Sequence, residues 1–425
     1  MDALGHIHSV LSIADELRRR GHKSIILTIR PLNMATELKA KGHGLECCEE
    51  QSRVTSSQSD LILKSIMQPM MDLFRQGLPK TFEATYTLGG ICEKHFDDIV
   101  SKHDLIEAKL RSLKPDVVVV DHIVGIPCAT QVARRWVRQY SSFPSVLYSC
   151  SNENYVAGLG LQLDKMTPEM KRFEKSTKAS LREKIRRYFA EKGCQDWPSC
   201  IDFMPTSPYL NFYLGIEELD LDKIASLEPL PANWFRLEHT LDGSERSDSF
   251  AIPENLSKCP GKLIYFSLGT LVTSDVDLIN RLLEILGKSP NKFIVSMGPM
   301  HNSIKLHPNM WGEKFLNQRA ILPKVSLFIT HGGHNSIIEA FYSGVPSLIV
   351  LPVFADQFDA AQRIEDCGFG VRLNPFSCTQ QELLSAIDSS LANKERGARM
   401  KLISERLRSI KYHELAADKI EELLL

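Results

Sequence analysis

Short apolar runs alternate with amphipathic stretches along the C-terminal part of the chain, and this alternation constrains the fold most strongly. The runs "KLIYFS", "KFIVS", "SLFIT" and "PSLIVL" have the length and composition of single buried strands. The stretches "DLINRLLEILG" and "SIIEAFYSG" between them have the apolar spacing of helices. Strands that alternate with helices form a parallel sheet with helices on both faces. The sequence therefore predicts a doubly wound α/β domain, followed by three or more closing helices.

The first half of the chain repeats this alternation. A helix is predicted at "HSVLSIADELRRRG", and fully buried parallel strands are predicted at "HKSIILTI" and "PDVVVV". Longer charged stretches at 60–115 and 160–195 are predicted to be helical. Between about 200 and 258 the periodicity is lost and Pro, Ser, Asp and Gly accumulate, as they do in interdomain connections.

This pattern predicts an N-terminal domain over residues 1–230, a linker over 231–258 and a C-terminal domain over 259–425. A length of 425 residues exceeds what one core usually supports, and 43% apolar with 24% charged residues is ordinary for a globular protein. Two doubly wound domains in tandem would enclose a cleft between the carboxyl ends of their sheets, where such sheets bind ligands.

Charge and cysteine usage exclude several partners. The net charge of -1, from 51 basic and 52 acidic residues, offers no electrostatic attraction to nucleic acid or to an acidic membrane. The ten cysteines show no repeated pair spacing, so reduced thiols are expected rather than a zinc site. No stretch reaches the roughly 18 to 20 apolar residues of a membrane span, and "MDALGHIHS" is unlike a signal peptide. We therefore expect a cytoplasmic chain.

The stretch "SLFITHGGHNSIIEAF" joins a buried strand to a helix through two glycines. Asn335 and Ser336 are residue types that cap helix starts. A helix N-terminus after a glycine turn has unpaired N–H groups and a partial positive charge, which suit a phosphate. Ser336 and Glu339 also fit a capping box, in which no ligand is involved. Both interpretations stay open on this stretch alone.

The longer pattern "HGGHNSIIEAFYSGVPSLIVLPVFADQFDAAQRIEDCGFGVRL" resembles the donor-binding signature of the UDP-glycosyltransferases, the family 1 enzymes with the GT-B fold. The resemblance covers nearly the whole chain. It implies two Rossmann-like doubly wound domains that face each other across a cleft. It also implies a UDP-sugar as co-substrate, a small lipophilic hydroxyl acceptor, often in detoxification, and no cofactor or metal.

The resemblance also implies roles for individual residues of the donor site. The UDP diphosphate would be held by His331, the amide of Gly333, Asn335 and Ser336. Glu339 would accept hydrogen bonds from the ribose hydroxyls.

Other donor contacts follow from neighbouring motifs. Asp356 and Gln357 match the pair that binds hydroxyls of the donor sugar. In "SLGT", Gly269 and Thr270 would approach the phosphates from the opposite wall. Gln318 matches a nucleobase-contacting Gln. Phe315 stands where many members have a Trp that stacks on uracil, and Asn317 replaces a Pro.

Catalysis is expected from the first domain. The stretch "GHIHSVLSIADELRRRGH" resembles the family's N-terminal motif, whose first His, here His6, is the general base. Asp121 ends the strand in "KPDVVVVDHIVG" and matches the acid that orients this imidazole. Without that acid and the donor motif, His6 would be interpreted as a mobile residue at a frayed terminus.

Two departures from the family pattern qualify this prediction. Only "MDALG" precedes His6, whereas family members have an apolar strand of about six residues there, so strands beside the missing one are expected to leave ladder groups unpaired. Ala360 replaces the usual Asn near the sugar-binding pair. The chain is then either a truncated product or a damaged enzyme.

The sequence thus predicts an inverting UDP-dependent transferase that moves a hexose, with glucose favoured, to a small lipophilic acceptor. The alternatives are a catalytically impaired UDP-sugar-binding homologue and a sugar-nucleotide epimerase. A non-enzymatic scaffold would not explain the ordered polar residues from His331 to Gln357. The acceptor pocket could include Phe74, Phe82, Tyr155 and Leu159, although core packing explains such residues equally well.

Overall fold

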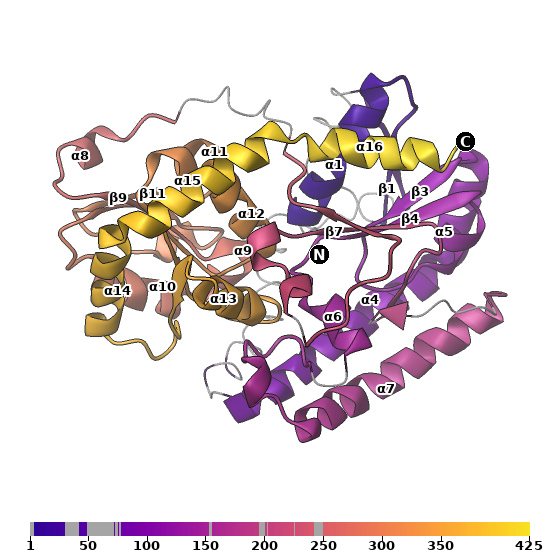
Figure 1. The fold of residues 1–425 in the computed structure, drawn as a ribbon, viewed down its shortest axis with the longest axis horizontal. Coiled ribbons are helices and arrows are strands. Elements are labelled where there is room, and N and C mark those ends of the chain that lie inside the picture. Colours follow the sequence, from indigo (N-terminus) through magenta and orange to yellow (C-terminus); the bar gives the residue numbers. More distant parts are fainter. Residues whose placement is uncertain are drawn as a thin grey trace.

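The computed structural model describes residues 4–29, 42–48, 72, 75, 78–152, 155–194, 200–201, 203–224, 226–241 and 250–425. Side chains are described from Ser9 onward in the first helix and from Cys92 onward in the long fourth one. Two α/β domains lie side by side, the first in purple and the second in orange (Figure 1). Each contains a parallel sheet with helices packed against it, which confirms the predicted fold class.

The second domain is built on a six-stranded parallel sheet with the order β11-β10-β9-β12-β13-β14. Along β9 the side chains alternate, because Leu263 and Tyr265 face one core and Ile264 and Phe266 the other. Both faces are therefore buried, as the continuous apolar runs predicted. The strands are β9 (Leu263–Ser267), β10 (Lys292–Ser296), β11 (Met310–Glu313), β12 (Leu327–Thr330), β13 (Leu348–Val350) and β14 (Gly370–Arg372).

Helices cover both faces of this sheet. Helices α12, α13 and α15 pack on the Tyr265 side, while α10 and α14 pack on the Phe266 side. Asp275 caps α10 by accepting from the Leu278 amide, and Thr379 with Glu382 forms a capping box on α14. The helices are α8 (Glu254–Ser257), α9 (Gly269–Val272), α10 (Val276–Leu286), α11 (Gln318–Ile321), α12 (His334–Ser343), α13 (Gln357–Asp366), α14 (Gln380–Ala392), α15 (Lys394–Ser409) and α16 (Tyr412–Glu422).

The first domain holds a four-stranded parallel sheet, β3-β4-β7-β8, and a separate parallel pair, β1-β2. Val117 and Val119 of β3 pack on one side with α1, and Val118 and Val120 pack on the other with α4 and α7. The strands are β1 (Ile25–Thr28), β2 (Gly44–Cys47), β3 (Val117–Val120), β4 (Arg135–Tyr140), β7 (Leu210–Leu214) and β8 (Trp234–Leu237), and a short antiparallel pair consists of β5 (Cys200–Ile201) and β6 (Met204–Pro205).

The prediction that β1 and β3 are fully buried was wrong, because both are mostly of intermediate exposure. Each is an end strand of its sheet, so in the described part of the chain each has a strand neighbour on one edge only. The helices of this domain are α1 (Leu4–Arg19), α4 (Leu78–Leu113), α5 (Pro127–Gln131), α6 (Ser145–Ser151) and α7 (Pro168–Glu191). Single 3-10 turns occur at Leu163–Lys165, Glu217–Leu219, Leu221–Lys223, His301–Ser303 and Leu322–Lys324.

The predicted linker begins with regular structure. Trp234–Leu237 forms β8, which pairs in parallel with β7 and belongs to the first sheet. Trp234 and Leu237 are buried there, so their packing determines a strand despite the surrounding turn residues. The stretch 242–249 of the predicted linker lies outside the described residues.

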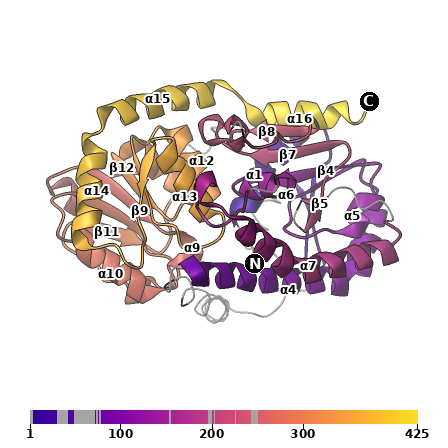
Figure 2. The same ribbon diagram turned by 60° about the horizontal axis from the view of Figure 1, so that its bottom comes forward.

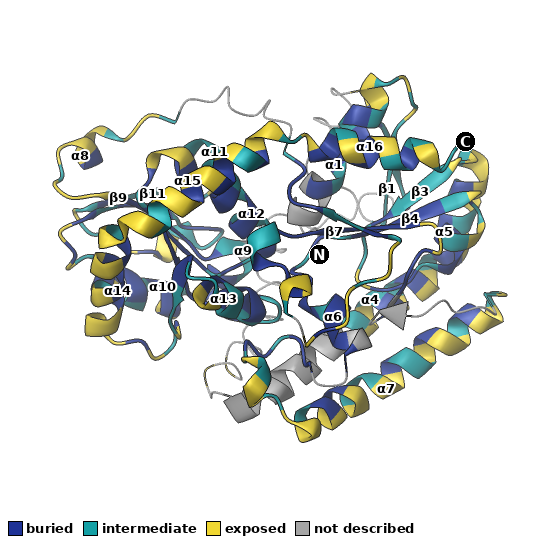
Figure 3. Ribbon diagram, in the orientation of Figure 1, coloured by how far each residue is buried: buried dark blue, intermediate teal, exposed yellow. Residues whose placement is uncertain are grey.

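The last two helices return from the second domain to the first. Figure 2 shows α15 and α16 running along the top of the molecule from one domain to the other. Helix α16 packs against α1, where Arg20 pairs with Asp418 at 2.5 Å and with Glu421 at 2.8 Å. One hydrophobic cluster joins residues of both domains, and Figure 3 shows the buried residues gathered in the sheets and on the inner sides of the helices.

Over the described ranges, none of the helices combines the length and apolar character needed to cross a membrane. The eight cysteines that the structure describes are all free thiols, as predicted.

Candidate functional site

The turn between β12 and α12 presents an open helix N-terminus. Gly332 has a φ of +86°, and a Cβ there would lie 2.7 Å from Val350 Cγ1, so only glycine fits. Helix α12 begins at His334 after Gly333, and no side chain caps it. The prediction that Asn335 or Ser336 caps this helix was therefore wrong, since both lie in its first turn. The capping box was wrong too.

His331 is enclosed by two glycine turns. A Cβ on Gly269 would lie 2.7 Å from the imidazole Nε2, and one on Gly333 would lie 2.5 Å from it. Burial lowers the pKa of His331 to about 4, so the ring is neutral at pH 7. Its Nδ1 is buried, and within the described residues it has no hydrogen-bond partner. The neutral ring is thus held between the two glycine turns, next to the N-terminus of α12.

The predicted opposite wall lies directly after β9. Gly269 begins α9 with a φ of +73°, and its close approach to His331 brings the "SLGT" turn to the β12–α12 turn. The backbone of Thr270 lies in α9, but its side chain lies outside the described residues. The two turns that were expected to flank the phosphates are thus adjacent.

Three residues predicted to bind the UDP-sugar donor converge, namely Gln318, Ser336 and Glu339. Gln318 Nε2 donates to Glu339 Oε2 at 2.6 Å and to Ser336 Oγ at 3.2 Å. Arg319, which was not predicted, donates from Nε to Glu339 Oε1 at 2.9 Å. Glu339 is thus held by α11 instead of the start of its own helix. The only sequence signal for Arg319 was its position beside Gln318.

Phe315 follows β11 and is 60% exposed. The ammonium group of Lys314 lies 5.4 Å from the centre of its ring. An exposed aromatic face can stack on a base. Asn317, which replaces the family's Pro, caps α11 by accepting from the Ala320 amide at 3.3 Å.

The predicted sugar-binding pair, Asp356 and Gln357, lies where the two domains meet. Asp356 Oδ2 accepts a hydrogen bond from the Phe143 amide of the first domain at 2.9 Å. Gln357 Oε1 accepts from the amides of Val353 and Phe354, at 3.0 and 3.2 Å. The amide oxygen of Gln357 thus shapes its own turn, while Asp356 links this turn to the opposite domain.

Asp359 is a second interdomain residue, and sequence reasoning missed it. Its carboxylate accepts from the amides of Gly158 at 2.6 Å and Gly160 at 2.8 Å. Burial raises its pKa to about 6. An acidic residue in the first turn of a helix normally indicates interaction with the helix dipole, so the pattern gave no signal for this contact.

His334 also joins the domains. Its Nε2 lies 3.0 Å from the Leu214 carbonyl oxygen, and its ring packs edge-on against Phe143 with centroids 5.8 Å apart. These contacts explain His334 structurally.

Of the two predicted catalytic residues, the structure describes the side chain of Asp121. This residue follows β3, and its Oδ2 accepts from Ser141 Oγ at 2.7 Å. Ser9 Oγ, on α1, lies 3.5 Å from the same oxygen. His6 lies in the first turn of α1, but its side chain lies outside the described residues. Ser9, which lies three residues after His6, brings α1 to Asp121.

The predicted acceptor-pocket residues are only partly placed. Tyr155 and Leu159 are buried, and Tyr155 packs with Tyr148, Tyr213 and Trp234 in a core cluster of the first domain. Phe74 and the side chain of Phe82 lie outside the described residues. Core packing accounts for Tyr155.

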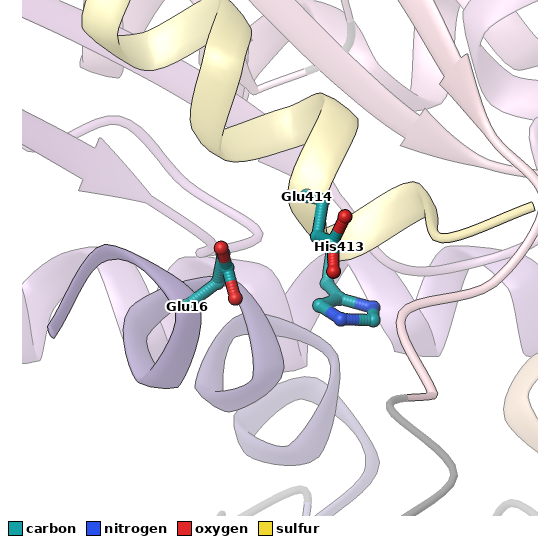
Figure 4. Close-up of side chains that lie close together, drawn as sticks. All are labelled: Glu16, His413 and Glu414. Atoms are coloured by element: carbon teal, nitrogen blue, oxygen red, sulfur yellow. The ribbon is translucent and has the colours of Figure 1, made fainter. Parts of the chain in front are cut away.

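Two groups of described residues have the types that bind metals, and neither includes a predicted donor residue. One consists of His103, Asp104 and Glu107, and the other of Glu16, His413 and Glu414. Figure 4 shows Glu16 on α1 facing the start of α16. The Glu16 carboxylate already pairs with Arg19 at 2.5 Å and Arg20 at 2.8 Å, so this group is explained by the packing of the two helices.

Comparisons with known proteins identify the class of protein that the chain resembles. Residues 256–408 match the family described as UDP-glucoronosyl and UDP-glucosyl transferase. The chain is 24% identical to UDP-glucuronosyltransferase 2B30 of Macaca fascicularis over 406 residues, which cover 90% of this chain and 75% of that protein. It is also 24% identical to human 2-hydroxyacylsphingosine 1-beta-galactosyltransferase over 437 residues, which cover 94% and 74% of the two chains.

A solved structure of the glycotransferase of kitacinnamycin has the same fold, with a TM-score of 0.71 at 19% identity, over 100% of this chain and 97% of that one. The family match covers the β9–α9 turn, the β12–α12 turn and the Gln318–Glu339 contact. Residues 256–408 therefore form a UDP-glycosyltransferase family domain, and the whole chain has the two-domain GT-B fold of glycosyltransferase enzymes.

Proposed function

We propose that this enzyme transfers a hexose from a UDP-sugar to a hydroxyl of a small lipophilic acceptor, with inversion at the anomeric carbon. The observation that carries the donor assignment is the convergence of Gln318, Ser336 and Glu339 beside the open N-terminus of α12. The carboxylate of Glu339 lies in α12 itself, so it can bind ribose hydroxyls while the N–H groups at the start of this helix bind the diphosphate.

The chemistry of transfer can be assigned to named groups. His6, oriented by Asp121, would take the proton of the acceptor hydroxyl. The oxygen would attack the anomeric carbon from the face opposite UDP, forming one C–O bond as the bond to UDP breaks. The leaving diphosphate keeps the electron pair, and its charge is stabilised by the α12 N-terminus, the Gly269 turn and His331.

Glucose is the proposed donor sugar. The stretch from Val353 to Gln362 around the sugar-binding pair contains no Lys or Arg that could bind a uronic carboxylate. Asp356 and Asp359 would instead repel such a group. A neutral hexose therefore fits better than glucuronic acid.

The test is a transfer assay on the full chain in EDTA. UDP release should be measured with UDP-glucose, UDP-glucuronic acid, UDP-galactose and UDP-N-acetylglucosamine against a panel of phenols. We expect UDP-glucose to be preferred, the product to have the β configuration by NMR, and the chelator to have no effect. Retention of configuration would contradict the mechanism, and isomerised UDP-sugar without acceptor would indicate an epimerase.

A second candidate is a protein that binds UDP-sugar without transferring it. It is favoured by the division of the first-domain strands, since β1 and β3 belong to separate sheets in the described part of the chain. Calorimetric binding of UDP together with no UDP release for any acceptor would support this candidate over the transferase.

A further inference from the structure

A buried polar network lies behind Asp121. Ser9 of α1, Gln139 of β4 and Ser141 directly after β4 are 3%, 1% and 2% exposed. Ser9 Oγ and Ser141 Oγ are 2.7 Å apart, and Gln139 Nε2 lies 3.2 and 3.3 Å from them. Ser141 Oγ then reaches Asp121 Oδ2 at 2.7 Å. Three elements of the first domain thus meet at one carboxylate oxygen.

The donor and acceptor of each hydrogen bond in this network follow from the groups involved. The amide nitrogen of Gln139 can only donate, so both hydroxyl oxygens accept from it. Each hydroxyl has a single proton left to give. Ser141 donates its proton to Asp121, and the Ser9 hydroxyl then has two acceptors in reach, Ser141 Oγ at 2.7 Å and Asp121 Oδ2 at 3.5 Å. The network therefore requires Asp121 to act as an acceptor at Oδ2, and it holds the carboxylate in one orientation.

We propose that Ser141, supported by Gln139 and Ser9, is a positioning residue that orients Asp121 toward the imidazole of His6. This inference rests on the proposed function, because it acts through the catalytic pair named there. Ser9 lies three residues after His6, so the same network also holds α1, the helix that contains His6, next to Asp121. Because the network is buried, removing the Ser141 hydroxyl would leave Asp121 Oδ2 without the donor that orients it.

The test compares Ser141→Ala with Asp121→Asn, with both changes together, and with Ser141→Thr, which keeps a hydroxyl. Ser390→Ala is the control, because Ser390 is a buried serine of the second domain, 2% exposed, on α14. Two readouts are used: kcat and KM for UDP-sugar with a phenolic acceptor, and the titration midpoint of His6 by NMR with labelled histidine, assigned by comparison with His6→Ala.

We expect Ser141→Ala to lower kcat roughly 10-fold with KM for the UDP-sugar unchanged, the scale of one hydrogen bond to a charged group. In Ser141→Ala the titration midpoint of His6 should fall, but by less than it falls in Asp121→Asn, because a misaligned carboxylate stabilises the imidazolium less. Adding Ser141→Ala to Asp121→Asn should change kcat less than twofold, because the two residues act as one unit. Ser141→Thr should retain most activity and Ser390→Ala all of it.

An equal loss of kcat from Ser141→Ala in both backgrounds would overturn the inference, as would an unmoved His6 midpoint. If Asp121→Asn itself changes neither kcat nor the midpoint, the catalytic pair of the proposed function has failed instead. The titration needs no turnover, so it also decides the question in a chain that binds UDP-sugar without transferring it.

Discussion

His331 shows how much one side chain depends on two backbone turns. Its ring fits only because Gly269 and Gly333 lack a Cβ, and the same enclosure lowers its pKa to about 4. The unfolded chain binds a proton near pH 6.5, whereas the folded chain binds it only near pH 4, so the free energy of unfolding falls as pH falls between these values.

This gives a prediction for His331→Gln, which replaces the ring by a neutral side chain. From pH 7 to pH 4 the parent chain should lose roughly 2 kcal/mol more of its free energy of unfolding than the variant. Urea unfolding at a series of pH values measures both. The interpretation fails if the two chains lose stability in parallel.

The proposed catalytic role of Asp121 gives a second prediction. Asp121→Asn should keep UDP affinity while lowering turnover by roughly 10² or more, because a neutral amide cannot stabilise the imidazolium. UDP binding is measured by calorimetry and turnover by UDP release. An equal loss of UDP binding in this variant would show that Asp121 has a structural role.

The identity of site residues was predictable where a motif specifies them, but their partners were not. The pattern identified Gln318 and Glu339, yet Arg319 and Asp359 became visible only when the fold brought α11 to α12 and α13 to the loop at 155–160. Those contacts depend on spatial packing between distant segments, for which residue types carry no signal.

At the scale of elements, most strands and helices were predicted because their apolar periodicity is regular. The predictions were wrong where a neighbouring strand determines the burial or the pairing of a segment. Strands β1 and β3 have fully apolar runs but lie at sheet ends, and β8 lies among turn residues but pairs with β7. Burial and pairing are properties of the sheet, so a run of residues cannot determine them.

The contact between α13 and the first-domain loop gives a third prediction, for Asp359→Asn. Because burial raises the pKa of Asp359 from about 3.8 to about 6, the folded chain holds this proton more tightly than the unfolded chain. The parent's free energy of unfolding, relative to the variant, should therefore fall by roughly 3 kcal/mol as pH rises from 4 to 7. Unfolding curves for both chains measure this difference. A constant difference across that range would contradict the account.

At the scale of the whole molecule, α15 and α16 fasten the second domain to the first. Arg406 of α15 pairs with Glu238, whose side chain is 2% exposed, and Tyr412 donates to the same carboxylate at 2.6 Å. Although burial alone would raise the pKa of Glu238, its hydrogen bonds with Arg406 and Tyr412 hold that pKa below its usual value. Glu238 is thus ionised in a buried interface between the domains.

Removing its partner gives a fourth prediction. Arg406→Ala should lower the free energy of unfolding at pH 7 by roughly 3 kcal/mol, because it leaves a buried carboxylate without its counterion. The loss should shrink as pH falls, because protonation of Glu238 in the folded variant removes the buried charge that lacks a counterion. Lys401→Ala, an exposed position on the same helix, is the control and should cost little. A pH-independent loss would show that Arg406 acts by packing.

The most direct test of the account is calorimetric titration of the full chain with UDP in EDTA. His331→Ala combined with Glu339→Ala removes the proposed diphosphate and ribose contacts. His307→Ala with Glu284→Ala removes the same residue types from a surface pair of the same domain. We predict that the parent and the surface variant bind UDP equally, and that the site variant binds at least roughly tenfold more weakly. Binding that vanishes with the chelator, or that survives unchanged in the site variant, would contradict the account.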